Sequence, residues 1–142
     1  MNEYSSAGDE AIKRGGSGGR FEARLDEGGF IVTAEFRPPT TANADYLIEK
    51  ARPIASRVDA ANVTDGAGAR VHTSSLAAVA LLARDGHEPI LQITCRDRNR
   101  IALEAHLLGA ATLGVHNILC MRGDDPSAGT IPMPRAFSTS TR

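Results

Sequence analysis

The chain has 142 residues, 42% of them hydrophobic, and its 16 basic and 17 acidic side chains give a formal net charge of -1. This composition predicts one globular unit, and the absence of a basic cluster argues against nucleic acid as a partner. No apolar run approaches the roughly 20 residues that cross a bilayer, so we expect a cytoplasmic protein without membrane contact.

The first segment, residues 1–20, is rich in glycine, serine and charge and shows no apolar period. Such a composition cannot offset the entropy lost on ordering, so we expect a disordered tail. Its GGSGG run neither follows a strand nor opens a helix, as a phosphate-binding loop would. The segment also lacks the apolar core of a signal peptide, and we expect no export signal.

From Phe30 onward, short β-rich runs alternate with longer helical ones, a pattern typical of parallel strands joined by helices. The strand starts are spaced close to the ~30 residues of one β-α-β step. Four such steps predict an α/β fold, a partial (β/α)8 TIM barrel. A doubly wound sheet fits the spacing too, but its first strand would feed a glycine-rich turn rather than two prolines. The predicted strands are Phe30–Phe36, Val58–Thr64, Pro89–Cys95 and His116–Met121.

Helical patterns fill the three connections. Asn43 is a suitable N-cap for the first helix, and Pro53 should kink or shorten it. Gly86 and Gly114 are expected to end the second and third helices. The apolar stripes expected to face the core are Leu47, Ala51 and Ile54; Leu76, Val79, Ala80 and Ala83; and Ile101, Ala105 and Leu108.

The two cysteines, Cys95 and Cys120, lie near the ends of separate predicted strands. They are too few and too far apart for a C-x-x-C metal or redox motif, and we predict no metal site. Free cysteine packs as a small hydrophobe, so we expect both thiols to be buried.

Polar residues recur near the carboxyl ends of the predicted strands, where barrels of this type build their sites. Because side chains alternate along a strand, the polar residues of each strand share one face. Strand-end hydrogen bonding explains any one of them equally well, but agreement among strands favours a binding face. They are Thr33 with Glu35, Asn62 with Thr64, and Gln92 with Thr94, followed by the loop Arg122-Gly123-Asp124.

Glu35 is the most informative position, because a carboxylate within the apolar run FIVTAEF must be paired or placed for proton transfer. Burial would disfavour its charged form and hold it protonated, as a general acid requires. The alternative is an ion pair with Arg37 or Arg96.

Five segments together suggest a family. They are AEFRPP, NVTDG, QITCRDRNR, LLGAATLGVHNIL and MRGDDP, and their order runs from Phe21 to Pro126. The set resembles bacterial methylenetetrahydrofolate reductases. The resemblance implies that residues 21–126 form the N-terminal half of that family's barrel.

The resemblance also implies site residues. Glu35 matches the family's proton donor to the folate, and Asp124 matches an aspartate that lies near the flavin and binds the pterin ring. The expected cofactor is FAD. FMN is the alternative, because Asp65 and Gln92 make two segments similar to an acetogen-like branch that includes FMN proteins and enzymes with iron-sulfur partners. The positions that match flavin contacts are Thr64, Ala67, Gln92, Met121, Arg122, Gly123 and Asp124.

The activity implied is reduction of 5,10-methylenetetrahydrofolate to 5-methyltetrahydrofolate, a step of one-carbon metabolism and methionine biosynthesis. NAD(P)H or a redox partner protein would reduce the flavin, and the full-length protein would be a homo-oligomer. Two alternatives stay open: a non-catalytic fragment or interaction module, and a flavin-free folate-binding methyltransferase barrel.

The last segment, residues 127–142, does not look like a fifth β-α unit. If residues 130–142 are encoded by suitable synonymous codons, a one-base shift of the reading frame would give an amino-acid sequence that resembles the family's usual continuation. We therefore expect an irregular, frameshifted tail and an incomplete barrel.

Overall fold

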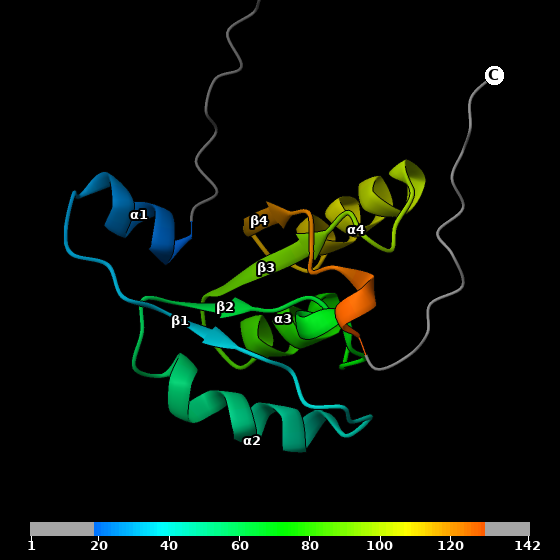
Figure 1. The fold of residues 1–142 in the computed structure, drawn as a ribbon. Coiled ribbons are helices and arrows are strands. Elements are labelled where there is room, and N and C mark those ends of the chain that lie inside the picture. The colour runs from blue at the N-terminus through cyan, green and yellow to red at the C-terminus, as the bar shows by residue number, and fades with distance from the viewer. Residues whose placement is uncertain (1–18, 130–142) are drawn as a thin grey trace, which may run out of the picture.

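A computed structural model describes residues 19–129, which fold as four strands and four helices (Figure 1). The strands form one all-parallel sheet in the order β1-β2-β3-β4. The expected α/β class and the half-barrel arrangement are confirmed. The elements are α1 (Arg20–Asp26), β1 (Thr33–Phe36), α2 (Ala44–Ala55), β2 (Ala60–Val63), the 3₁₀ turn η1 (Ala67–Ala69), α3 (Ser75–Arg84), β3 (Pro89–Thr94), α4 (Arg100–Thr112), β4 (Asn117–Met121) and the 3₁₀ turn η2 (Pro126–Ala128).

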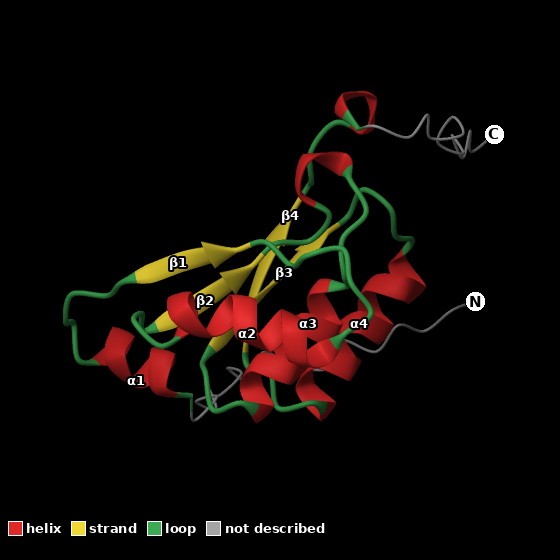
Figure 2. Cartoon of the chain, turned by 90° about the horizontal axis from the view of Figure 1, so that it is seen from below, coloured by secondary structure: helices red, strands yellow, loops and turns green. Residues whose placement is uncertain are grey.

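The sheet has one apolar and one polar face. Figure 2 shows α2, α3 and α4 on the same side of the sheet, as in a barrel and unlike a doubly wound fold. Their side chains pack on the apolar face, and each fully buried Leu or Val contributes about 1.5–3 kcal/mol. The core includes Phe36, Leu47, Ala51, Val63, Val79, Leu82 and Leu91.

The polar face follows from the register of the strands. Glu35 pairs with Asn62 between β1 and β2, and Thr94 pairs with Met121 between β3 and β4. In a parallel sheet, paired residues point to the same side, so the polar residues of neighbouring strands lie together. The α2, α3 and α4 layer leaves this face free.

The predicted start of α2 is confirmed, because the Asn43 side chain accepts a 3.1 Å hydrogen bond from the Tyr46 N–H. Pro53 lies inside the last turn of α2, and the helix ends two residues later at Ala55. Gly86 and Gly114 follow α3 and α4 with φ of 84° and 75°, the left-handed conformation expected of a helix stop.

Three expectations about burial are wrong. On α4, Ile101 and Leu108 are 79% and 71% exposed, and Ala110 is the buried residue. That helix is apolar on more than one side, so its periodicity did not identify the packed side. Cys95 and Cys120 are both exposed, because the first follows the end of β3 and the second lies on the edge strand β4. On α3, Val79 is buried as expected, but Ala78 and Leu82 accompany it instead of Ala80 and Ala83.

Helix α1 was not expected, and it begins at Arg20, the last residue of the predicted tail. Its side chains hold it at the amino ends of the strands: Arg20 Nη2 donates a 2.9 Å hydrogen bond to the Gly86 carbonyl, and Arg24 lies 3.5 Å from an Asp59 oxygen. The rest of the predicted tail, 1–18, and residues 130–142 lie outside the described residues. None of the helices within 19–129 has the length and apolar character that a bilayer span requires.

Candidate active site

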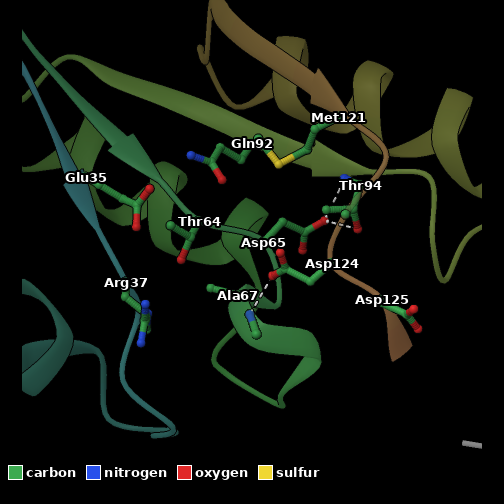
Figure 3. Close-up of a pocket in the computed structure, with 12 residues that line it drawn as sticks. Glu35, Arg37, Thr64, Asp65, Ala67, Gln92, Thr94, Met121, Asp124 and Asp125 are labelled. Atoms are coloured by element: carbon green, nitrogen blue, oxygen red, sulfur yellow. Dashed lines mark hydrogen bonds between the residues drawn. The ribbon is translucent and has the colours of Figure 1, made fainter. Parts of the chain in front are cut away.

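A cavity of about 750 Å³ opens at the carboxyl ends of the strands, and we call it the main cavity (Figure 3). All but one of the predicted site residues line it. The exception is Arg122. The lining residues are Glu35, Arg37, Thr64, Asp65, Ala67, Gly68, Gln92, Thr94, Met121, Gly123, Asp124 and Asp125.

Glu35 and Asp124 come from opposite edges of the sheet, since Glu35 lies on β1 and Asp124 follows β4. Both line the main cavity. The parallel order β1-β2-β3-β4 produces this convergence, because it places all four carboxyl ends at one rim.

Glu35 is exposed in this structure, so the expectation that it is buried is wrong. Its strand lies at the edge of the sheet, and no element of residues 19–129 covers the polar face above it. The alternative ion pair with Arg37 or Arg96 is absent as well among the ion pairs of the described chain. The Glu35 carboxylate is therefore available to a ligand.

Asp65, at the end of β2, forms the most complete polar contact in the site. It accepts hydrogen bonds from both terminal nitrogens of Arg98 and from the N–H and hydroxyl of Thr94, at 2.9 and 3.0 Å for the latter two. Burial tends to raise the pKa of Asp65, but the hydrogen bonds from Arg98 and Thr94 outweigh it and lower the pKa below its ordinary value. Asp65 is thus ionised, and the positive charge of Arg98 balances its negative charge. Its hydrogen bonds fix β3 against the loop after β2.

Asp124 is held by backbone. Its Oδ2 accepts a 2.6 Å hydrogen bond from the N–H of Gly68, in the η1 turn. Gly68 has φ of 67°, a conformation that glycine adopts without a steric cost. The turn that follows β2 therefore positions the carboxylate that follows β4.

Arg96 also links these two loops, the one that follows β2 and the one that follows β4. Its Nη1 donates to the carbonyls of Gly66 and Asp124, at 3.3 and 3.5 Å, while Asp97 pairs with its other nitrogens. A Cβ on Gly66 would lie 2.6 Å from Arg96 Nη2, and a Cβ on Gly123 would lie 3.2 Å from Arg96 Cβ. Both glycines give the space that this partly buried arginine needs.

Thr64 is 3% exposed, and its hydroxyl oxygen has no hydrogen-bond partner within the described residues. Buried hydroxyls are usually satisfied, because an unmade hydrogen bond costs about 1–3 kcal/mol. The Thr64 side chain lies in the main cavity between Glu35 and Asp65 (Figure 3). This oxygen is available to a bound polar group. Asn62 Oδ1, nearer the amino end of β2, lacks a partner in the same way.

Arg122 is the predicted site residue that the main cavity excludes. It is exposed and borders a second cavity of about 410 Å³, together with Arg96, Gly123, Asp124, Asp125 and Pro126. Hydrogen bonds from Ser127 lower the pKa of Asp125, and the charge of Arg122 adds to this effect.

Sequence reasoning assigned no binding role to three arginines, the first two of which it named only as possible ion-pair partners of Glu35: Arg37, Arg96 and Arg98. The segment TCRDRNR contains the last two, and its dense charge resembles an ordinary solvated loop. Their partners lie about 30 residues away along the chain, at separations of 33, 30 and 28. A pairing over that distance leaves no local pattern in the sequence.

A family model described as methylenetetrahydrofolate reductase matches residues 20–138. Among curated proteins, none matches the chain significantly. The resemblance found in the five sequence segments is therefore confirmed at the level of the family. The match extends beyond Pro126 into the segment where we expected an irregular tail, and the frameshift stays a prediction.

Proposed function

This chain belongs to the methylenetetrahydrofolate reductase family, a family of oxidoreductases, and we propose that it serves the flavin-dependent reduction of 5,10-methylenetetrahydrofolate to 5-methyltetrahydrofolate. The observation that carries the proposal is that Glu35 and Asp124 line one cavity, from strands at opposite edges of the sheet. An acid and a pterin-binding carboxylate must both reach one substrate, and this arrangement permits it.

The chemistry of the lining supports a flavin as the cofactor, with FAD preferred and FMN as the alternative. A volume of about 750 Å³ lies in the range of roughly 300–1,000 Å³ usual for cofactor sites. Thr64 offers a buried hydroxyl without a partner in the described part of the chain, and Gln92, 5% exposed, offers an amide. Ala67, Gly68 and Gly123 have little or no side chain, so a flat ring can approach the backbone. A bound flavin would supply the hydride for the reduction.

Asp124 orients the substrate in this proposal. Its carboxylate can accept hydrogen bonds from the amino group and ring N–H of a pterin, while the Gly68 N–H fixes the position of Oδ2. A substrate held in this way presents one defined carbon for reduction, and orientation of this kind accounts for much of the rate that enzymes achieve.

Glu35 acts as the general acid. It donates a proton to one bridging nitrogen of the folate, directly or through a water. The bond from that nitrogen to the methylene carbon then breaks, and the five-membered ring opens to an iminium at the other nitrogen. Proton donation by a positioned side chain contributes typically 10²–10⁴-fold to a rate.

The proposed electron donor is NAD(P)H or a redox partner protein, and the proposed location is the cytoplasm. The direct test is to purify the chain, record the visible absorption of oxidised flavin, and follow formation of 5-methyltetrahydrofolate. A coloured protein with folate-dependent reoxidation of reduced flavin is the expected result. A colourless protein that binds folate would instead favour a flavin-free folate-binding barrel.

A further inference from the structure

Arg37 is the single cationic residue in the lining of the main cavity as described. Within residues 19–129 its guanidinium makes no hydrogen bond and no ion pair, although Glu35, on β1, lies only two positions earlier in the chain. The neighbouring arginines are engaged: Arg98 is paired with Asp65 and Arg96 with Asp97. Five donor groups on Arg37 therefore face the cavity side of the molecule without a protein acceptor.

The backbone that presents Arg37 is fixed. Pro38 is among the fully buried side chains, and the Pro39 carbonyl accepts hydrogen bonds from the N–H and the hydroxyl of Thr73, at 3.1 and 2.7 Å. The loop after β2 thus anchors the chain directly behind Arg37. A cation on an anchored backbone loses less freedom when it binds a ligand.

The charges of the cavity are arranged along the sheet. Arg37 lies on the β1 side, and Asp124 and Asp125 follow β4; Figure 3 shows Arg37 on one side of the cavity and Asp125 on the other, with Asp124 nearer the middle. Asp65 lies between them but is neutralised by Arg98. A ligand with hydrogen-bond donors at one end and an anionic group at the other would be oriented by this difference in charge.

We propose that Arg37 binds an anionic oxygen group of the ligand whose donor-bearing end is held at Asp124. This inference rests on the proposed function. A folate fits the charge arrangement, because its pterin carries an amino group and its glutamate carries carboxylates. The phosphate of a flavin nucleotide shares the chemistry, since a guanidinium binds carboxylate and phosphate with the same paired geometry. The two sources are separable by experiment.

The experiment compares ligands that differ only in the anionic group. Dissociation constants are measured for tetrahydrofolate against tetrahydropteroate, which lacks the glutamate, and for FMN against riboflavin, which lacks the phosphate. The proteins are the unmodified chain, Arg37→Gln, Arg37→Lys and a matched control, Arg57→Gln. Arg57 is exposed at the end of α2 and does not line the cavity.

We expect one of the two ligand pairs to show about a tenfold preference for its anionic member in the unmodified chain. The preference should fall to near onefold in Arg37→Gln, recover in part in Arg37→Lys, and stay intact in Arg57→Gln. Loss in the folate pair identifies the glutamyl carboxylate, and loss in the flavin pair identifies the phosphate.

Ligand binding with both preferences unchanged in Arg37→Gln overturns the inference and leaves the proposed function standing. If the unmodified chain binds none of the four ligands, the proposed function fails and the inference fails with it. Urea unfolding of each variant shows whether the fold is retained, and Arg37→Lys keeps the test valid if the glutamine variant unfolds.

Discussion

The backbone N–H of Gly68 donates a 2.6 Å hydrogen bond to Oδ2 of Asp124, and this bond joins two loops that are 56 residues apart in the chain. One loop follows β2 and the other follows β4. The bond is part of the fold itself, so the backbone turn after β2 fixes the orientation of the carboxylate. Preorganisation of this kind lowers the cost of binding.

Asp124→Asn and Asp124→Ala should separate the two roles of this carboxylate. Asparagine keeps an oxygen that accepts from Gly68 but removes the charge, whereas alanine removes both. Because Asp124 is exposed, we expect the alanine variant to lose only about 0.5–1.5 kcal/mol of stability and the asparagine variant to lose less. Both should bind tetrahydrofolate about tenfold more weakly. Urea unfolding and equilibrium binding measure the two effects, and normal folate binding by Asp124→Ala would contradict the pterin role.

Glu35→Gln should abolish folate reduction while it leaves reduction of the flavin intact. Glutamine has almost the same shape but cannot donate the proton, and loss of a general acid costs roughly 10²–10⁴-fold. The two half-reactions are followed separately by flavin absorbance. Glu49→Gln, on the exposed side of α2, is the matched control and should retain both. Equal loss of both half-reactions in Glu35→Gln would argue against the acid role.

The strands and their parallel order could be predicted because alternation and spacing are local properties of the sequence. The strand starts were placed within three residues in every case, and the faces of Glu35, Thr64 and Gln92 followed from alternation. Convergence of Glu35 and Asp124 needed one further assumption, that the carboxyl ends of parallel strands meet at one rim.

Burial could not be predicted in the same way, because it depends on what packs above each face. Glu35 lies in an apolar run yet is exposed, since no element of the described chain covers that edge of the polar face. Ile101 and Leu108 read as a core stripe, but the α4 side that packs carries Ala110. The pairing of Asp65 with Arg98 spans 33 residues and leaves no periodic trace.

Thr64→Val should leave the free chain as stable as before or more stable, because the Thr64 hydroxyl is buried and has no partner among residues 19–129. The same substitution should weaken binding of the ligand that this hydroxyl contacts, by up to about tenfold. Thr94→Val is the matched control, since the Thr94 hydroxyl donates a 3.0 Å hydrogen bond to Asp65. That variant should lose stability. Urea unfolding with and without FMN or FAD measures both, and a large loss of stability in Thr64→Val would show that its hydroxyl is already satisfied.

Acid should weaken the fold through Asp65. Hydrogen bonds from Arg98 and Thr94 lower the folded-state pKa of Asp65, although burial alone would raise it. The contribution of the ionised Asp65 to folding stability is therefore fully present above about pH 4, the unfolded pKa, and is lost as the pH falls through the folded pKa. Asp65→Asn should remove this part of the acid dependence and cost on the order of 3 kcal/mol near neutral pH. Asp85→Asn removes an exposed carboxylate that also accepts two bonds from one arginine, and it should cost much less. The urea midpoint of unfolding is measured from about pH 7 to about pH 3 for the unmodified chain and for Asp65→Asn. If the midpoints of the two proteins fall with pH by the same amount, Asp65 is not the source of the acid dependence.

Gly66 and Gly68 provide a test of how Arg96 holds the loops together. Both glycines have positive φ, 61° and 67°, so alanine at either position carries a similar backbone strain of about 1–2 kcal/mol. Their surroundings differ, because a Cβ at Gly66 would lie 2.6 Å from Arg96 Nη2 whereas a Cβ at Gly68 meets nothing within 4 Å. Gly66→Ala should therefore be the more destabilising change, since it also displaces the guanidinium from the carbonyls of Gly66 and Asp124.

The contribution of Arg96 is isolated by repeating both alanine substitutions in an Arg96→Ala background. There the obstructing side chain is gone, so the excess cost of Gly66→Ala over Gly68→Ala should disappear, and the difference is the coupling energy between Gly66 and Arg96. Urea unfolding gives the four free-energy differences. An excess that persists without Arg96 would mean that the added cost at Gly66 does not come from contact with the Arg96 side chain, which would contradict the prediction.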